Sequence, residues 1–104
     1  MIRHIVAFRL SAPSEVERDR DAAEFAARLE ALYDVVPGVL GIKVHRDVGL
    51  VSSHWPLVLV ADFTNLDALA AYQSHPRHVA VIDWANAGVV ADRAVVDFEV
   101  APSS

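Results

Sequence analysis

Apolar and polar residues alternate along the first segment of the chain, residues 2–10. One set of alternate positions holds Ile2, His4, Val6, Phe8 and Leu10. The other set holds Arg3, Ile5, Ala7 and Arg9. This period of two is typical of a β-strand, and the apolar set predicts that one face of the strand is buried.

A helix is predicted to follow the first strand. Ser14 and Glu17 form the S-x-x-E pattern of a capping box, directly after a proline. Helical spacing then continues to about Val35, with apolar residues at Phe25, Leu29, Leu32 and Val36. The Pro-Gly pair at positions 37 and 38 ends this helix.

The second half of the chain predicts strands at 39–48, 57–63 and 89–100, with a loop at 49–56. Residues 57–63 are almost all apolar, which is typical of a central strand. Thr64 and Asp67 predict the cap of a short helix that ends near residue 74. Pro76 lacks a backbone N–H, so it ends that helix and begins a new one, which is expected to run to residue 86.

The resulting order is β-α-β-β-α-β, which predicts an α+β, ferredoxin-like sandwich with the helices on one face of a four-stranded antiparallel sheet. The predicted helix-covered face carries Val6, Phe8, Leu10, Leu59, Phe63, Val96 and Phe98. The predicted open face has an apolar centre and a charged rim, consisting of Ile5, Ala7, Val58, Val60, Val95, Arg9, Lys43, His45, Asp62, Asp97 and Glu99. Such a face is typical of an interface, so we expect a two-fold homodimer with facing sheets, a dimeric α+β barrel.

Composition limits the classes of partner. The chain has 104 residues, enough for one domain, expected at 1–101 with a C-terminal tail at 102–104. The net charge is −5 and the nine Lys and Arg are scattered, which argues against nucleic acid and anionic membranes as partners. No apolar run approaches the ~18 residues of a membrane span, so we expect a cytoplasmic protein. The absence of cysteine excludes thiolate chemistry.

Candidate chemistry concentrates between Tyr72 and His78. A histidine in the first turn after Pro76 lies near the positive end of the helix dipole, which lowers its pKa and favours the neutral ring of a general base. Tyr72 is placed to polarise a carbonyl. His4 points beneath the helices by its phase, and His75 is expected either to face the same cavity or to cap the helix. The alternative is that the whole stretch is a kinked connector, whose polar groups satisfy freed backbone groups.

A metal site is not expected. His75 and His78 are three residues apart across a proline, unlike the i, i+4 pair of a helical zinc site, and no acidic residue lies between them. We also expect no organic cofactor.

The sequence resembles the stress-responsive dimeric α/β-barrel (Dabb) family over about residues 2–100. The resemblance rests on IRHIVAFRL at the start, VPGV after the first helix, LVLVADF in the third strand, LAAYQSHPRH at the helix break and VVDF near the end. It implies a ferredoxin-like protomer that pairs sheet to sheet. One plant member, olivetolic acid cyclase, is a cofactor-free polyketide cyclase. The resemblance to it implies His78 as base, Tyr72 as orienting group and His4 as a third site residue, while Leu57 stands where that enzyme has a histidine.

Three functions follow as hypotheses. The first is a cofactor-free cyclase or lyase that binds a small apolar carbonyl or polyketide-like compound and uses His78 as general base. The second is a non-catalytic stress-response or ligand-binding dimer, and the third is a cofactor-free monooxygenase. The first requires a cavity, expected at ~300 Å³ or more, lined by His4, Tyr72 and His78.

Overall fold

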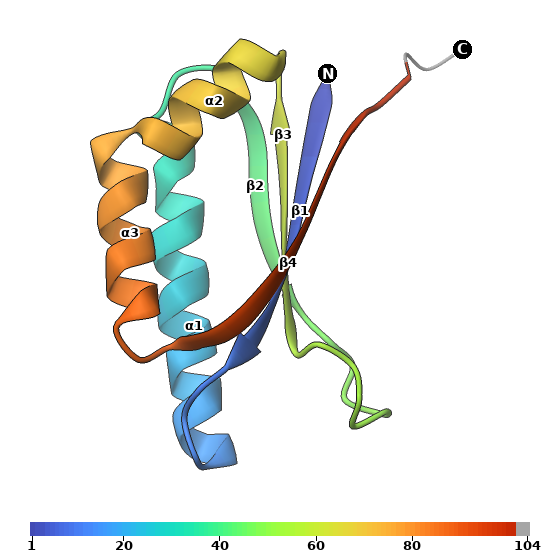
Figure 1. The fold of residues 1–104 in the computed structure, drawn as a ribbon, viewed down its shortest axis with the longest axis vertical. Helices are drawn as coiled ribbons and strands as arrows, with labels where there is room; N and C mark the ends of the chain where they lie inside the picture. The colour runs from blue at the N-terminus through green and yellow to red at the C-terminus, as the bar shows by residue number, and fades with distance from the viewer. Residues whose placement is uncertain (102–104) are drawn as a thin grey trace.

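The computed structural model describes residues 1–101 and shows a four-stranded sheet with every described helix on one face (Figure 1). The predicted ferredoxin-like order is confirmed, and the tail expected at 102–104 lies outside the described residues. The strands are β1 (Ile2–Leu10), β2 (Val39–Arg46), β3 (Leu57–Phe63) and β4 (Val90–Glu99). The helices are α1 (Glu15–Glu30), the 3-10 turn η1 (Ala31–Asp34), α2 (Leu66–Ser74) and α3 (Pro76–Asn86).

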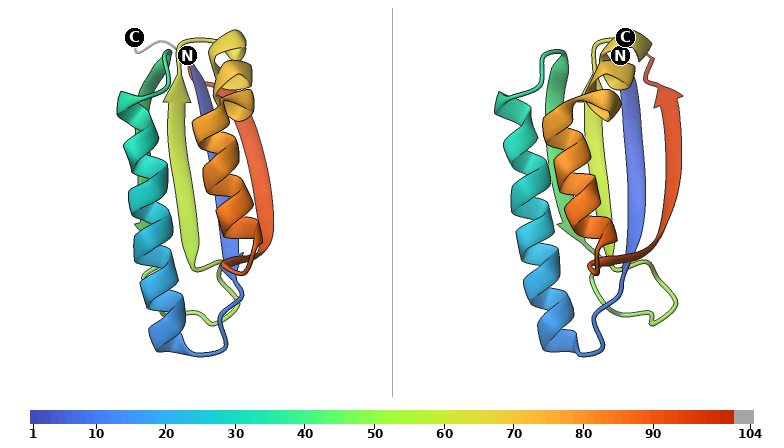
Figure 2. Two further views of the ribbon diagram at one scale, coloured as in Figure 1. Left: turned by 90° about the vertical axis from the view of Figure 1, so that its left-hand side faces the viewer. Right: turned by 60° about the vertical axis from the view of Figure 1, so that its left-hand side comes forward.

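The sheet is antiparallel throughout, in the order β2-β3-β1-β4. In β1 buried and half-buried residues alternate up to Arg9, as its sequence predicts. β3 alternates in the same way along its whole length, and its predicted place as a central strand is confirmed by the strand order. Figure 2 shows α1 and α3 lying over the sheet, with β4 at one edge. The core between the layers is centred on large buried side chains from both, including Phe8, Phe25, Leu29, Leu57 and Phe63.

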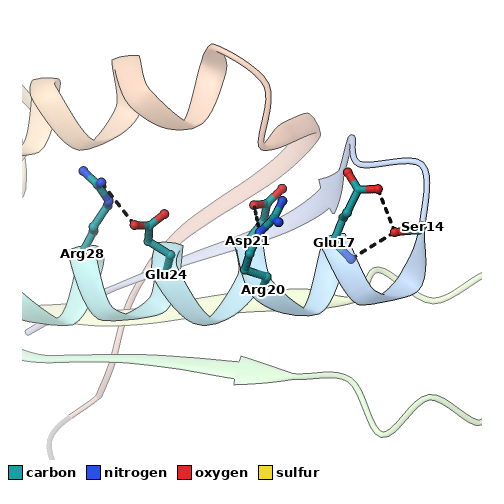
Figure 3. A network of polar contacts seen from close by, with 6 residues as sticks. All are labelled: Ser14, Glu17, Arg20, Asp21, Glu24 and Arg28. Carbon is teal, nitrogen blue, oxygen red and sulfur yellow. Dashed lines mark hydrogen bonds and ion pairs between the residues drawn. The ribbon is translucent and has the colours of Figure 1, made fainter.

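Helix α1 begins at the predicted capping box. The Ser14 hydroxyl oxygen accepts the Glu17 N–H at 3.1 Å, and the hydroxyl donates to the Glu17 carboxylate at 3.0 Å (Figure 3). Such a cap typically stabilises a helix by about 1 kcal/mol. Further along the exposed side, Arg28 pairs with Glu24 at 3.4 Å, one turn away. This pair is exposed and adds only about 0.3–0.5 kcal/mol.

The Pro37-Gly38 turn does more than end the first helical segment. Gly38 has a φ of +84°, and a Cβ at this position would lie 2.8 Å from the Ala68 Cβ on α2. A side chain is therefore excluded both by backbone conformation and by the neighbouring helix. The glycine allows α2 to pack closely against the start of β2.

The predicted cap of α2 is wrong by one residue. Asn65, not Thr64, is the N-cap, and its side-chain oxygen accepts the Ala68 N–H at 2.9 Å. Asp67 lies in the first turn instead of acting as a capping partner. Both Thr and Asn are good N-cap residues, and the backbone at position 65 is the one that is extended just before the helix.

The prediction of which β4 residues face the helices is also wrong, by one position along the strand. Directly paired residues of antiparallel strands share a face. Val95 pairs with Val6 and Asp97 with His4, so these two, and Glu99 opposite Ile2, face the helices. Val96 pairs with Ile5 and Phe98 with Arg3, so they lie on the open face. The Val95-Val96 doublet puts an apolar residue in each phase, so alternation alone does not decide the facing of this edge strand.

The open face of the sheet has an apolar centre and a polar rim. Its apolar residues are Ile5, Ala7, Val58, Val60, Val96 and Phe98, of which Val96 is 61% and Phe98 42% exposed. At the rim, Arg3 pairs with Asp62 at 2.8 Å, and the Arg9 guanidinium stacks 4.3 Å from the centroid of Trp55. The loop 47–56 projects on this side, away from the helices (Figure 1). None of the helices in residues 1–101 has the length and apolar character that a membrane crossing requires.

Candidate functional site

A cavity of about 160 Å³ lies between the sheet and the helices. Its apolar wall consists of Val6, Phe8, Leu59 and Val95 from the strands with Leu29 and Ile82 from α1 and α3. Four polar side chains complete the lining, those of His4, Gln73, His78 and Arg93. The volume is close to the ~150 Å³ of a cavity that holds one benzene-sized molecule.

The cavity is smaller than the expected ~300 Å³, and Tyr72 is not part of its lining. A row of aromatic side chains occupies the adjacent space. The rings of Phe8 and Phe25 lie 4.9 Å apart, and those of Phe25 and Trp84 lie 6.0 Å apart. Phe8 is also part of the cavity wall, so this row of rings borders the cavity directly.

The break between α2 and α3 sets the protonation pattern of His78. Pro76 is the first residue of α3, as predicted, and the Arg77 N–H bonds to the His75 ring at 3.1 Å. In an unbroken helix this N–H would bond to the carbonyl of Gln73. That carbonyl instead accepts a hydrogen bond from Nδ1 of His78 at 3.1 Å. A carbonyl only accepts, so Nδ1 carries the proton and Nε2 of the neutral ring is the acceptor.

The surroundings of His78 favour this neutral form. Burial of the half-buried ring is the main cause that lowers the pKa of His78, and the positive potential of His4, Arg93 and His75 lowers it further. The hydrogen bond to Gln73 raises the pKa, but less than burial lowers it. At neutral pH the ring is therefore uncharged and able to take a proton.

Tyr72 lies beside His78 and is completely buried. Its ring centroid is 4.3 Å from that of His78, 4.9 Å from that of Phe63 and 6.4 Å from that of His4. Among the described residues its hydroxyl has no hydrogen-bond partner, and burial raises the pKa of Tyr72. A buried hydroxyl without a partner is rare, and it is typical of a place where a water or a ligand supplies the missing bond.

His4 is buried, as its phase in β1 predicts, and has a carboxylate partner. Its Nδ1 bonds to the carboxylate of Asp97, which lies directly opposite on β4. A carboxylate that is ionised only accepts, so Nδ1 carries a proton. Asp97 thereby fixes the orientation of the His4 ring at the cavity wall.

His75 occupies the helix break and does not line the cavity. It ends α2, and its ring nitrogen accepts the Arg77 N–H as the N-cap of α3. Of the two roles considered for this residue, the structure shows the cap.

Comparison with known proteins agrees with this architecture. The model of the stress-responsive A/B barrel domain matches residues 2–100. The chain belongs to this family, known as Dabb. No protein with a curated description matches its sequence.

Solved structures similar to this Dabb chain share its fold. One from Bacteroides fragilis, described as a dimeric protein of unknown function with a ferredoxin-like fold, is 30% identical, with 95% of each chain covered and a TM-score of 0.83. A dimeric ferredoxin-like protein from Thermobifida fusca is 28% identical, with 95% of this chain and 90% of that chain covered and a TM-score of 0.77. A protein from Deinococcus radiodurans, provisionally described as an antibiotic biosynthesis monooxygenase, is 18% identical, with 100% and 96% covered and a TM-score of 0.79.

Two charged residues of the site were not among the candidates from the sequence, Arg93 and Asp97. Both lie on β4, whose facing the alternation leaves ambiguous. The signal that finds them is pairing with β1, because Arg93 lies opposite Phe8 and Asp97 opposite His4. Within residues 1–101, no three His, Asp or Glu side chains gather in an arrangement that could hold a metal ion.

Proposed function

We propose that this Dabb protein binds a small apolar carbonyl compound in the cavity and acts on it without a cofactor, as a cyclase or lyase that uses His78 as general base. The observation that carries the proposal is the state of His78. This ring lines the cavity, its Nδ1–H is held by the Gln73 carbonyl, and its pKa is lowered. A neutral imidazole with a free Nε2 is the form that a general base needs.

In this proposal, Nε2 of His78 removes a proton from the carbon next to the substrate carbonyl. The Tyr72 hydroxyl has no partner in the described protein and lies behind the cavity wall, so this proposal requires the wall to open when the ligand binds, and the hydroxyl then donates to the enolate oxygen that forms. The enolate carbon then attacks a second carbonyl, and protonated His78 returns its proton to the new alkoxide. His4, oriented by Asp97, is the third polar group of the site. We assign His75 no step, because its ring caps α3.

The size of the cavity limits the substrate. A volume of about 160 Å³ encloses one small ring or a short chain. A longer polyketide-like chain would keep only its reacting end inside.

The alternative is a dimer that binds the same ligand without reacting. It is favoured by the position of Tyr72, whose hydroxyl is buried behind the cavity wall instead of lining it. The monooxygenase description belongs to the Deinococcus protein, and at 18% identity that likeness speaks for the fold alone.

Deuterium exchange separates these readings. Acetophenone is incubated with the protein in D₂O. Saturation-transfer NMR measures its binding, and ¹H NMR measures the loss of its methyl protons. The enzyme hypothesis expects binding and exchange in the wild type, and binding without exchange in His78→Gln. His54→Gln, an exposed histidine in the loop 47–56, is the matched control and should leave exchange unchanged. Binding without exchange in the wild type indicates the ligand-binding dimer, and no binding contradicts both readings.

For the assembly, we propose a two-fold homodimer in which the open sheet faces pack together. The relatives from Bacteroides fragilis and Thermobifida fusca are described as dimeric. Support from this chain is the exposed apolar centre of the open face, with Val96 and Phe98 outermost. A monomer would leave this patch in water, which is unfavourable.

A further inference from the structure

Arg93 places a positive charge at the wall of the cavity. The residue lies on β4 opposite Phe8 and is half-buried. Its guanidinium bonds to the side-chain oxygen of Asn86, a neutral group. Within residues 1–101 it forms no ion pair with a carboxylate, although other arginines of the chain, such as Arg3, Arg28 and Arg46, do.

The surroundings of Arg93 divide the cavity into two kinds of surface. Besides Arg93, the polar residues of the cavity wall are His78, Gln73 and His4. The remaining residues of the wall are aliphatic or aromatic. The carboxylate of Asp97, which lies opposite His4 on β4, is already engaged by the His4 ring. Arg93 is half-buried, lies next to an uncharged His78 and faces an apolar space. Its positive charge therefore has no negative charge opposite it among the described residues of the cavity. The complementary ligand is a small apolar molecule with an anionic group at one end.

We propose that the ligand of this cavity is a small apolar carboxylic acid, whose carboxylate is recognised by Arg93 while its ring or alkyl chain fills the apolar end. This inference rests on the proposed function, because it names the substrate class of the same site. A planar carboxylate matches the guanidinium fork, and the apolar wall beyond it accepts a ring-sized group. If the protein is an enzyme, its substrate is then an oxo acid whose reacting carbon lies near His78.

Benzoate and benzamide test the inference, because they have nearly the same shape and differ in charge. Their affinities are measured by isothermal titration calorimetry with the wild type, Arg93→Gln and Arg20→Gln. Arg20 is the matched control, since it loses the same charge on the exposed side of α1 (Figure 3). We expect the wild type and Arg20→Gln to bind benzoate about tenfold more tightly than benzamide, the size of a charge-assisted hydrogen bond. Arg93→Gln should bind the two about equally.

Each outcome has a separate meaning. Equal affinities in the wild type, or a benzoate preference that survives in Arg93→Gln, overturn the role of Arg93 and leave the proposed function standing. If neither molecule binds, the inference is contradicted, and acetophenone binding in the saturation-transfer experiment decides separately whether the proposed function stands. If Arg93→Gln fails to fold, Arg93→Lys replaces it. The lysine keeps the charge without the fork, so it should weaken benzoate binding yet keep a preference over benzamide, and an unchanged benzoate affinity overturns the inference.

Discussion

The rings of Tyr72 and His78 lie with their centroids 4.3 Å apart and their planes tilted by 45°, although one belongs to α2 and the other to α3. The helix break at Pro76 brings them together, because it turns the chain between them and frees the Gln73 carbonyl that holds the His78 ring. One proline thus determines both the position of the candidate base and the nitrogen on which it carries its proton.

Replacing Tyr72 with phenylalanine should separate stability from function. The hydroxyl has no partner among the described residues, so its removal should leave the free energy of unfolding unchanged or raise it by up to about 1–3 kcal/mol. Exchange of acetophenone protons should fall, because the enolate loses its donor. Urea unfolding gives the first quantity and NMR the second. Tyr33→Phe, at a 49% exposed position, is the control for both. A clear loss of stability in Tyr72→Phe would show that the hydroxyl has a structural bond.

The lowered pKa of His78 predicts a pH dependence of stability. In the unfolded chain this histidine titrates near 6.5, and in the folded protein it titrates lower. Just below pH 6.5 the unfolded state therefore binds more protons, so the free energy of unfolding should decrease as the pH falls through this window. His78→Gln should show a shallower decrease, and His54→Gln should match the wild type. Urea titrations at pH 7.5, 6.5 and 5.5 measure the slopes. Identical slopes in the wild type and His78→Gln would contradict the prediction.

Removal of the Asp97 carboxylate should destabilise the fold through His4. Asp97→Ala leaves the buried Nδ1–H of His4 without an acceptor, which costs about 1–3 kcal/mol. Asp97→Asn keeps an acceptor oxygen and should lose less. Glu99→Ala, two residues further along β4, is the control and should stay within about 0.5 kcal/mol of the wild type. Chemical denaturation checks the order, and an equal loss in Asp97→Ala and Glu99→Ala would argue against the pair.

A lysine at position 96 should convert the proposed dimer to a monomer. Val96 belongs to the apolar residues of the open face and is 61% exposed, so a lysine there would place a charge against the apolar face of the partner. Light scattering at micromolar concentration should give the dimer mass for the wild type and the monomer mass for Val96→Lys. Val16→Lys, which changes a 79% exposed residue on α1, should remain a dimer. A dimeric Val96→Lys variant would place the interface elsewhere.

Alanine at position 38 should destabilise the protein more than alanine at position 41. Gly38 combines a φ of +84° with a Cβ position 2.8 Å from Ala68, whereas a Cβ on Gly41 meets nothing within 4 Å. We expect Gly38→Ala to cost about 1–3 kcal/mol, the usual range for a strained backbone residue. Gly41→Ala should have little effect. Thermal unfolding of the two variants side by side measures the difference, and similar melting temperatures would contradict it.

The sequence predicts those parts of the molecule in which buried and exposed positions differ strongly in polarity. β1 and β3 have one face in the core, so their alternation or apolar run identifies them and places His4 beneath the helices. Pro76 identifies the helix break through its missing N–H, and with it the start of α3. The chemistry that follows from local chain geometry was therefore accessible from the sequence.

Where the two faces of an element are similarly exposed, the sequence does not determine which residues lie on which face. β4 is an edge strand that is largely exposed on both faces, and its Val95-Val96 doublet fits either facing. The partner of His4 and the cation of the cavity, Asp97 and Arg93, were missed for that reason. The volume of the cavity is a second case, since it depends on how Phe8, Phe25 and Trp84 pack together, which residue spacing does not determine.

β4 supplies Arg93 and Val95 to the cavity wall, Asp97 to the ring of His4, and Val96 and Phe98 to the opposite side of the sheet. If an insertion or deletion in the turn 87–89 shifted this strand by one position along β1, the two sets would exchange sides. His4 would lose its acid, the cavity would lose its arginine, and charged groups would enter the apolar centre of the open face. The length of this short turn is thus a shared requirement of the pocket and the interface, although none of its residues belongs to either.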